Sequence, residues 1–192
     1  MLYTELDLPQ PEDLLQRLIT QTAWQQEDIT LFGRTHPQPR LVAWYGDPDA
    51  HYSYSGIAHK PNPWTRDLSA LRSRMEDVCD CSFNSVLLNY YRNQRDSMGL
   101  HADDEPELGA TPVIASLSLG EERKLYFKHK TEKERASVNV SLPSGSLLVM
   151  RADTQKNWKH GMRKLTRQCG PRVNLTFRRI FNSAELVHSQ GD

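Results

Sequence analysis

Short segments with a side-chain period of two fill the second half of the chain, and they limit its fold more than any other feature. They are rich in β-branched and aromatic residues and are separated by turn residues, as is typical of β-strands. The segments are 84–91, 112–119, 123–129, 137–142, 146–151 and 172–181. Many short strands that follow one another predict an antiparallel barrel or sandwich.

Two helices are expected before these strands. The first spans residues 11–24, where a proline and two acidic residues suit a first helical turn. The second is expected to begin at Asn62-Pro63, because asparagine is a favoured cap and proline suits the first helical position. Its apolar stripe consists of Trp64, Leu68, Leu71, Met75 and Val78. The predicted fold class is therefore α+β, mainly β, with N-terminal helices packed on the strands.

The length of 192 residues suits one domain, 1–192, with a proper core. We expect helices and recognition loops in residues 1–82, the strand-rich core in 83–182 and a short tail in 183–192. The chain has no run of eighteen apolar residues, and its acidic N-terminus lacks the signal-peptide pattern. We therefore expect a cytoplasmic monomer that has no membrane partner.

Charge and cysteine content constrain the partners only weakly. The formal net charge is zero, but residues 1–30 contain six acidic side chains and one basic, and the remainder has 23 basic and 18 acidic side chains. This bias is compatible with a phosphate-binding face, although basic surface residues usually form a solvated face. The three cysteines, Cys79, Cys81 and Cys169, lack zinc-ligand spacing, and we expect reduced thiols.

A candidate metal site begins with the segment GLHADDE, which contains His101 and Asp103. Positions two apart on an extended segment face the same way and can bind one ion. A third candidate ligand, His160, lies in NWKHGMRK, and two histidines with one carboxylate form the facial triad of non-haem iron(II) oxygenases. An H-x-D pair is common by chance, and a lone histidine is more often an ordinary polar group, so the pair alone does not settle the question.

The terminal strand segment PRVNLTFRRIF alternates polar and apolar residues. Its polar members, on one face of a strand, are Arg172, Asn174, Thr176 and Arg178. Arginine binds carboxylates in a bidentate manner, so two arginines suit a dicarboxylate. Their α-carbons are expected to lie about 20 Å apart, so each side chain must reach a different end of the ligand. A solvated arginine face is the alternative.

Taken together, these motifs resemble the AlkB family of dioxygenases in order and spacing. The phrases FNSVLLNYY, HADDEPELG, PVIASLSLG and PRVNLTFR carry the resemblance, which runs from about residue 30 to 181. The chain is most similar to the branch with the animal base-repair demethylases. The resemblance implies a double-stranded β-helix, or jelly-roll, and a need for Fe(II), 2-oxoglutarate and O2.

The resemblance also implies a role for each motif residue. His101, Asp103 and His160 are expected to bind iron. Arg172 is expected to hold the distal carboxylate of 2-oxoglutarate, and Arg178 the end nearer the metal. The supporting residues are Asn89, Tyr91, Asn174 and Thr176.

The loop 31–34 (LFGR) is similar to the apolar finger with which the branch's duplex-repairing members fill the gap left by an extruded base, with Phe32 as the wedge. The other expected base- and backbone-binding residues are Gly33, Arg34, Arg40, Tyr52, Tyr54, Asp104 and Glu105. Glu105 departs from members with aspartate there, which puts the base preference in doubt. Lys128, Lys130, Lys133 and Arg135 form a charged hairpin tip that suits either a second DNA strand or plain solvation.

The function implied by the resemblance is oxidative demethylation of N-alkylated bases such as 1-methyladenine and 3-methylcytosine in DNA, with RNA as an alternative, and formaldehyde as the by-product. A first rival is an oxygenase of the same chemistry that acts on protein or lipid. A second is a non-catalytic nucleic-acid module with a vestigial site. Iron-dependent succinate release and oligonucleotide binding discriminate among the three.

Overall fold

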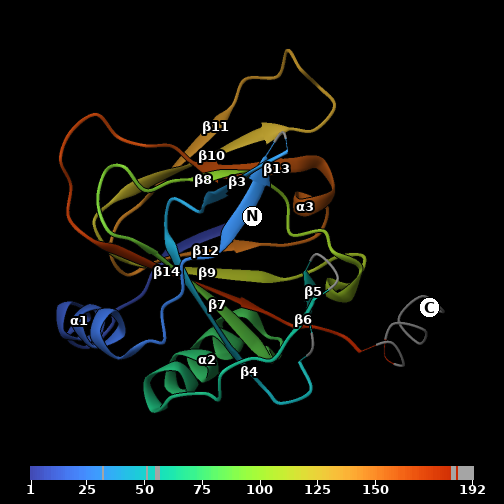
Figure 1. Ribbon diagram of the computed structural model, residues 1–192. Helices are drawn as coiled ribbons and strands as arrows, with labels where there is room; N and C mark the ends of the chain where they lie inside the picture. Colours follow the sequence, from blue (N-terminus) through green and yellow to red (C-terminus); the bar gives the residue numbers. More distant parts are fainter. Residues whose placement is uncertain (32, 51, 55–56, 183–184, 186–192) are drawn as a thin grey trace.

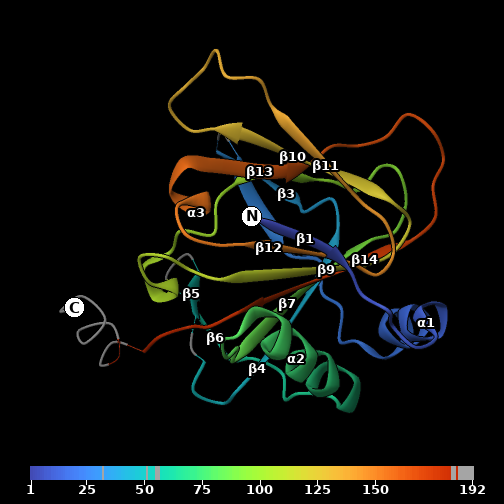
Figure 2. The same cartoon turned by 180° about the vertical axis from the view of Figure 1, so that it is seen from behind.

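The computed structural model describes residues 1–31, 33–50, 52–54, 57–182 and 185. Two antiparallel sheets lie face to face, and helices α1 and α2 cover the outer side of the larger sheet (Figures 1 and 2). The larger sheet has the order β1 (Leu2–Glu5), β12 (Ser146–Met150), β9 (Ile114–Gly120), β14 (Arg172–Arg178), β7 (Ser85–Tyr91) and β4 (Leu41–Gly46). The smaller sheet has the order β11 (Val138–Leu142), β10 (Arg123–His129), β13 (Trp158–Met162) and β8 (Met98–His101).

Two hairpins and two short helical segments complete the described structure. The hairpins are β2 (Asp28–Leu31) with β3 (Arg34–Pro37), and β5 (Tyr52–Tyr54) with β6 (Ile57–His59). The helical segments are the 3-10 turn Pro106–Leu108 and α3 (Thr154–Asn157). Among the described residues, no helix has the length and apolar character needed to cross a membrane.

The first helix, α1, spans Pro11–Gln21 and is three residues shorter than the sequence predicts, because the chain becomes extended at Thr22. The start predicted for the second helix is wrong: α2 spans Arg66–Cys79, and Thr65 is its cap, with a side-chain oxygen that accepts from the Leu68 amide. Asn62 instead donates its side-chain amide to the Trp44 carbonyl at 2.9 Å and so joins the region of β4.

The apolar stripe of α2 also differs from the prediction at both ends, since Trp64 lies two residues before the helix. Leu68, Leu71 and Met75 are buried as expected, but Val78 is exposed, and Cys79 closes the stripe instead. The helix ends in a left-handed residue, Asp80, which turns the chain toward β7. The buried face therefore extends one residue further along the helix than its hydrophobic pattern suggests.

Hydrophobic residues form two separate cores on either side of the larger sheet. One core lies between this sheet and the two helices, and it includes Leu18, Met75 and Val173. The second core lies between the two sheets and includes Phe127 and Met162. Strand β14 is central in the larger sheet, between β9 and β7, and both of its faces are buried. Its apolar side chains contact the helix core, and its polar row lies between the two sheets.

The six expected strands are observed as β7, β9, β10, β11, β12 and β14, with shifts of up to three residues at their ends, but the alternation of residues did not place β1 to β6, β8 or β13. His160 follows the strand 146–151, as the sequence suggests, and lies within a strand of its own, β13. The sequence of β13, WKHGM, has no apolar alternation, because its inward positions include the polar side chain of His160 and its outward positions include a glycine.

Candidate active site

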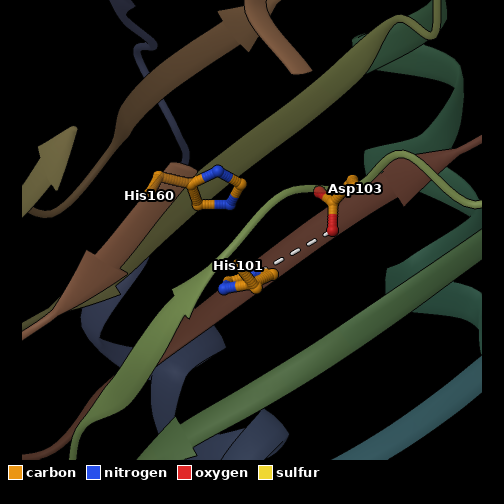
Figure 3. Close-up of side chains that lie close together, drawn as sticks. All are labelled: His101, Asp103 and His160. Carbon is orange, nitrogen blue, oxygen red and sulfur yellow. Dashed lines mark ion pairs between the residues drawn. The ribbon is translucent and has the colours of Figure 1, made fainter. Parts of the chain in front are cut away.

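His101, Asp103 and His160 converge on one point, as the sequence predicts. His101 and His160 are direct partners in the antiparallel pairing of β8 with β13, and Asp103 follows β8 by two residues. One ligand atom from each residue lies within 4.8 Å of the other two. Figure 3 shows the three side chains turned toward one another. Strand pairing therefore joins ligands that are about sixty residues apart in the chain.

The protein environment prepares both histidines to act as metal ligands. The Nδ1 atom of His101 lies 3.0 Å from the Gly99 carbonyl oxygen, which directs its proton there and leaves Nε2 for a metal. Burial and the nearby His101 lower the pKa of His160 to about 4. Its imidazole therefore keeps a free lone pair at neutral pH.

Asp103 is held by two neighbours that are remote in sequence. Arg178 donates from Nη2 to Oδ1 of Asp103 at 2.9 Å, and the Asp103 amide donates to Oε1 of Gln155 at 3.0 Å. Burial alone raises the pKa of Asp103, but Arg178, His160 and His101 together bring it below its ordinary value. Oδ2 of this buried carboxylate has no hydrogen-bond partner among the described residues. A buried anionic oxygen without a partner fits a metal ligand.

The donor set matches Fe(II) better than a structural metal. Two imidazoles and one carboxylate on one side leave the remaining coordination positions for other ligands, whereas a structural zinc site is closed by four protein donors. The side chain of His101 is 37% exposed, so the triad is accessible to solvent on its side. Its partners Asp103 and His160 are only 4% exposed.

Arg172 forms the most polar part of the space between the sheets. Its guanidinium is 1% exposed, donates from Nη2 to Oγ of Ser118 at 2.9 Å and lies 5.3 Å from the centre of the Tyr91 ring. Neither Nε nor Nη1 has a hydrogen-bond partner among the described residues. Burial lowers the pKa of Arg172 to about 10, so the group remains charged at neutral pH. A buried, half-satisfied cation is costly, and a carboxylate is the ligand that satisfies it.

The other polar residues of β14 are already satisfied by protein groups. Asn174 donates to Oγ of Ser116 and to the Leu117 carbonyl, both at 2.9 Å, and Thr176 donates to Oδ1 of Asn174 at 3.1 Å. The row therefore ends in two arginines with different surroundings: Arg178 contacts a member of the triad, and Arg172 lies at the far end. Direct contacts of Asn174 and Thr176 with 2-oxoglutarate stay predictions.

Strand register places the two supporting residues of β7 beside this row. Tyr91 pairs with Arg172, and Asn89 pairs with Asn174. The Tyr91 hydroxyl contacts the sulfur of Met98 at 3.6 Å. Oδ1 of Asn89 accepts from Nε of Arg40 at 2.7 Å, and the expected contact of Arg40 with a phosphate stays a prediction.

The expected base-binding residues are only partly described. Phe32 lies outside the described residues, and Tyr52 and Tyr54 are placed only as members of β5. Gly33 adopts a positive φ of 76° at the turn of the β2–β3 hairpin, and Arg34 is exposed beside it. Their roles stay predictions.

The acidic pair after the triad aspartate has two different environments. Asp104 is exposed and forms an ion pair with Nζ of Lys130 at 2.6 Å, which ties the triad loop to the charged hairpin tip. Oε2 of Glu105 is buried without a hydrogen-bond partner among the described residues. Glu105 therefore has a carboxylate oxygen free for a ligand group, and Asp104 is already engaged.

Gln155 and Ser118 are functional neighbours that the sequence did not reveal. Gln155 lies in the polar segment DTQKNW, outside the motifs quoted above, and Ser118 lies within PVIASLSLG, to which the sequence assigns no ligand contact. Ser118 could have been found from its alternation with apolar residues in β9. Gln155 carries no such signal, because its contact with the Asp103 amide depends on the turn that α3 makes before β13.

Comparison with known proteins agrees with this geometry. The family model for the 2OG-Fe(II) oxygenase superfamily matches residues 6–178. A curated relative, the mouse alpha-ketoglutarate-dependent dioxygenase alkB homolog 3, is 41% identical over 184 residues, which cover 92% of this chain and 64% of the mouse protein. The human DNA oxidative demethylase ALKBH2 is 39% identical over 158 residues, 79% of this chain and 60% of that protein. The chain thus spans less than two thirds of the length of these relatives.

The solved structure of OsALKBH1 superposes with a TM-score of 0.63 at 20% identity, and covers 92% of this chain and 97% of that one. At this identity the likeness concerns the fold alone, and it confirms the jelly-roll. The curated relatives confirm the resemblance to AlkB proteins.

Proposed function

The chain belongs to the 2OG-Fe(II) oxygenase superfamily, and from this premise we propose that it oxidatively removes alkyl groups from nucleic-acid bases. The observation that carries the proposal is the pairing of two sites on one buried face. Strand β14 places Arg178 at the triad and the half-satisfied guanidinium of Arg172 at the far end of the same polar row. A set of metal ligands at one end of the row and a carboxylate-binding arginine at the other suit the two ends of 2-oxoglutarate.

Each protein group has a defined task in this proposal. Fe(II), with 2-oxoglutarate and O2, would supply the oxidation of the N-methyl carbon, and the methyl group would leave as formaldehyde. His160 stays unprotonated for the metal, and Arg178 keeps Asp103 ionised. Arg172 receives the distal carboxylate, and its rigid contact with Ser118 fixes the orientation. The apolar residues between the sheets, such as Phe127 and Met162, exclude water from this space.

The nucleic-acid substrate is the finer part of the proposal. One group of curated relatives is named alpha-ketoglutarate-dependent dioxygenase alkB homolog 3, and another is named DNA oxidative demethylase ALKBH2. The free carboxylate oxygen of Glu105 suits a base that N-alkylation has made positive, as in 1-methyladenine and 3-methylcytosine. We propose DNA as the main substrate and RNA as a second one.

The test measures succinate and formaldehyde together. The protein is incubated with Fe(II), ascorbate, 2-oxoglutarate and an oligonucleotide that contains 1-methyladenine. We expect both products, in equal amounts, and neither without 2-oxoglutarate or with the His160→Ala variant. Succinate without formaldehyde indicates an oxygenase with another substrate. Oligonucleotide binding without either product indicates a non-catalytic binding module, and both of these results contradict the proposal.

A further inference from the structure

The outer face of the smaller sheet carries a group of basic residues that the active site does not use. The long helices α1 and α2 lie beyond the larger sheet, on the opposite side of the molecule (Figures 1 and 2). Along β10, Arg123, Leu125 and Phe127 are buried, and the intervening side chains face outward. The outward group, here called the outer basic face, consists of Lys124, Tyr126, Lys128, Lys159 and Arg163.

The basic side chains of this face form no ion pairs in the described part of the chain, although Glu122 and Glu134 lie in the turns that flank β10. Lys128 and Lys159 are direct partners in the pairing of β10 with β13, and like charges opposite each other destabilise a sheet. The strands β8, β10, β11 and β13 contain no aspartate or glutamate. In the flanking turns, Glu121 pairs with Arg167 and Glu132 with Arg135. Among the described residues, none of the four basic groups of this face forms an ion pair.

An aromatic ring lies within this charged surface. The guanidinium carbon of Arg163 is 4.4 Å from the centre of the Tyr126 ring. Gly161 is the strand partner of Tyr126, and a β-carbon there would lie 3.1 Å from the ring atom Cε1. Glycine therefore lets the ring lie close to β13, where it supports the planar guanidinium. Basic side chains interleaved with a planar stacking surface are the components of sites for single-stranded nucleic acid.

We propose that the outer basic face binds the phosphodiester backbone of a single nucleic-acid strand, as a second site on the opposite face of the sheet from the triad. The proposal deepens the proposed function and rests on it for the choice of partner. Lys159 and Gly161 flank the ligand His160 in the chain, so the face lies on the reverse side of the sheet that holds the metal site. From Lys124 to Lys128 the strand extends about 13 Å, so the basic side chains at its two ends can reach different phosphates of one nucleic-acid strand.

The test compares two double variants that each remove two positive charges. Lys128→Gln with Lys159→Gln alters the outer basic face. Arg66→Gln with Arg74→Gln alters α2 on the opposite side of the molecule and serves as the control. Binding of a fluorescently labelled, unmethylated oligothymidylate is followed by anisotropy over a range of NaCl concentrations. We expect the first variant to bind more weakly and to lower the slope of log K against log [NaCl] by about 1.4, since each single-strand phosphate contact contributes about 0.7.

The expected control result is a slope equal to that of the wild type. Thermal unfolding checks that both variants are folded, and loss of the Lys128–Lys159 repulsion should leave the Tm of the first variant equal or higher. An unchanged slope in the first variant, equal losses in both variants, or no binding by the wild type overturns the proposal. A drop in slope confined to duplex DNA overturns the single-strand assignment.

Turnover of a methylated trinucleotide, too short to reach around the sheet, separates this proposal from the proposed function. We expect the Lys128→Gln, Lys159→Gln variant to demethylate it at the wild-type rate. If the wild type binds oligothymidylate with the expected slope but demethylates nothing, the proposed function fails and the second site stands. If the wild type demethylates and the variant keeps its slope, the second site fails alone.

Discussion

The contact between Gln155 and Asp103 allows a sharp test of how the metal site is supported. Gln155 is 1% exposed; its Oε1 accepts from the Asp103 amide at 3.0 Å, and its Nε2 lies 3.3 Å from the sulfur of Met150. The substitution Gln155→Leu keeps a side chain of similar size and removes the acceptor. The Asp103 amide is then left without a partner in a buried setting, because no other hydrogen bond from this amide is present in the described structure.

The expected magnitude follows from the cost of a buried, unsatisfied amide. That cost is about 1–3 kcal/mol, which we expect as the loss in free energy of unfolding. Asp103 also keeps its contact with Arg178, so the carboxylate remains ionised but its backbone is less fixed. Loss of a residue that orients a metal ligand lowers metal affinity by about 10- to 100-fold, and we expect a loss in that range for Mn(II), a redox-stable substitute for Fe(II).

Two measurements separate the effect on stability from the effect on metal affinity. Urea unfolding gives the change in stability, and isothermal titration calorimetry gives the Mn(II) affinity of the folded variant. Gln38→Leu is the matched control, because Gln38 is also a buried glutamine and its Oε1 has no partner among the described residues. We expect this control to bind Mn(II) as the wild type does. If Gln155→Leu is folded and binds Mn(II) with wild-type affinity, Gln155 does not position the ligand and the reasoning is refuted.

Three further substitutions test the remaining parts of the site. His160→Ala is expected to abolish succinate release and to lower Mn(II) affinity; retained turnover removes His160 from the triad. Arg172→Met removes a buried, half-satisfied cation, so we expect the Tm of the protein without 2-oxoglutarate to stay equal or rise. The KM for 2-oxoglutarate is expected to rise at least about tenfold, because charge-assisted hydrogen bonds are lost. An unchanged KM contradicts the assignment of Arg172. Phe32→Ala is expected to weaken repair of duplex DNA more than repair of single strands, and equal losses on both substrates rule out a wedge.

The sequence predicts correctly those segments in which the alternation of polar and apolar residues matches the burial of their side chains. The row of Arg172 to Arg178 was placed on one strand face because a period of two survives in a strand buried on both sides. Ligand types and spacing make the triad a candidate, and the resemblance to the AlkB family selects it from the alternatives. The strand β13 escaped prediction because its histidine faces the interior and its glycine faces outward beneath Tyr126, so hydrophobicity does not alternate there.

The remaining differences depend on tertiary contacts that no local pattern contains. Asn62 is a residue type that favours helix caps, but its side chain donates a hydrogen bond to the Trp44 carbonyl. Thr65 caps the helix instead. Arg40 has the chemistry of a phosphate ligand, and the fold pairs it with Asn89. Gln155 contacts Asp103, which is 52 residues away in the chain, and no local sequence pattern predicts a contact between residues so far apart.

The central claim, demethylation of a nucleic-acid base at this triad, is tested most directly by mass spectrometry of the substrate itself. A single-stranded oligonucleotide that contains 1-methyladenine is incubated with the protein, Fe(II), ascorbate and 2-oxoglutarate, and again without 2-oxoglutarate. We predict that the oligonucleotide loses the mass of its methyl modification only in the complete reaction, and that Arg172→Met slows this loss. An oligonucleotide of unchanged mass in the complete reaction, with succinate still produced, contradicts the claim.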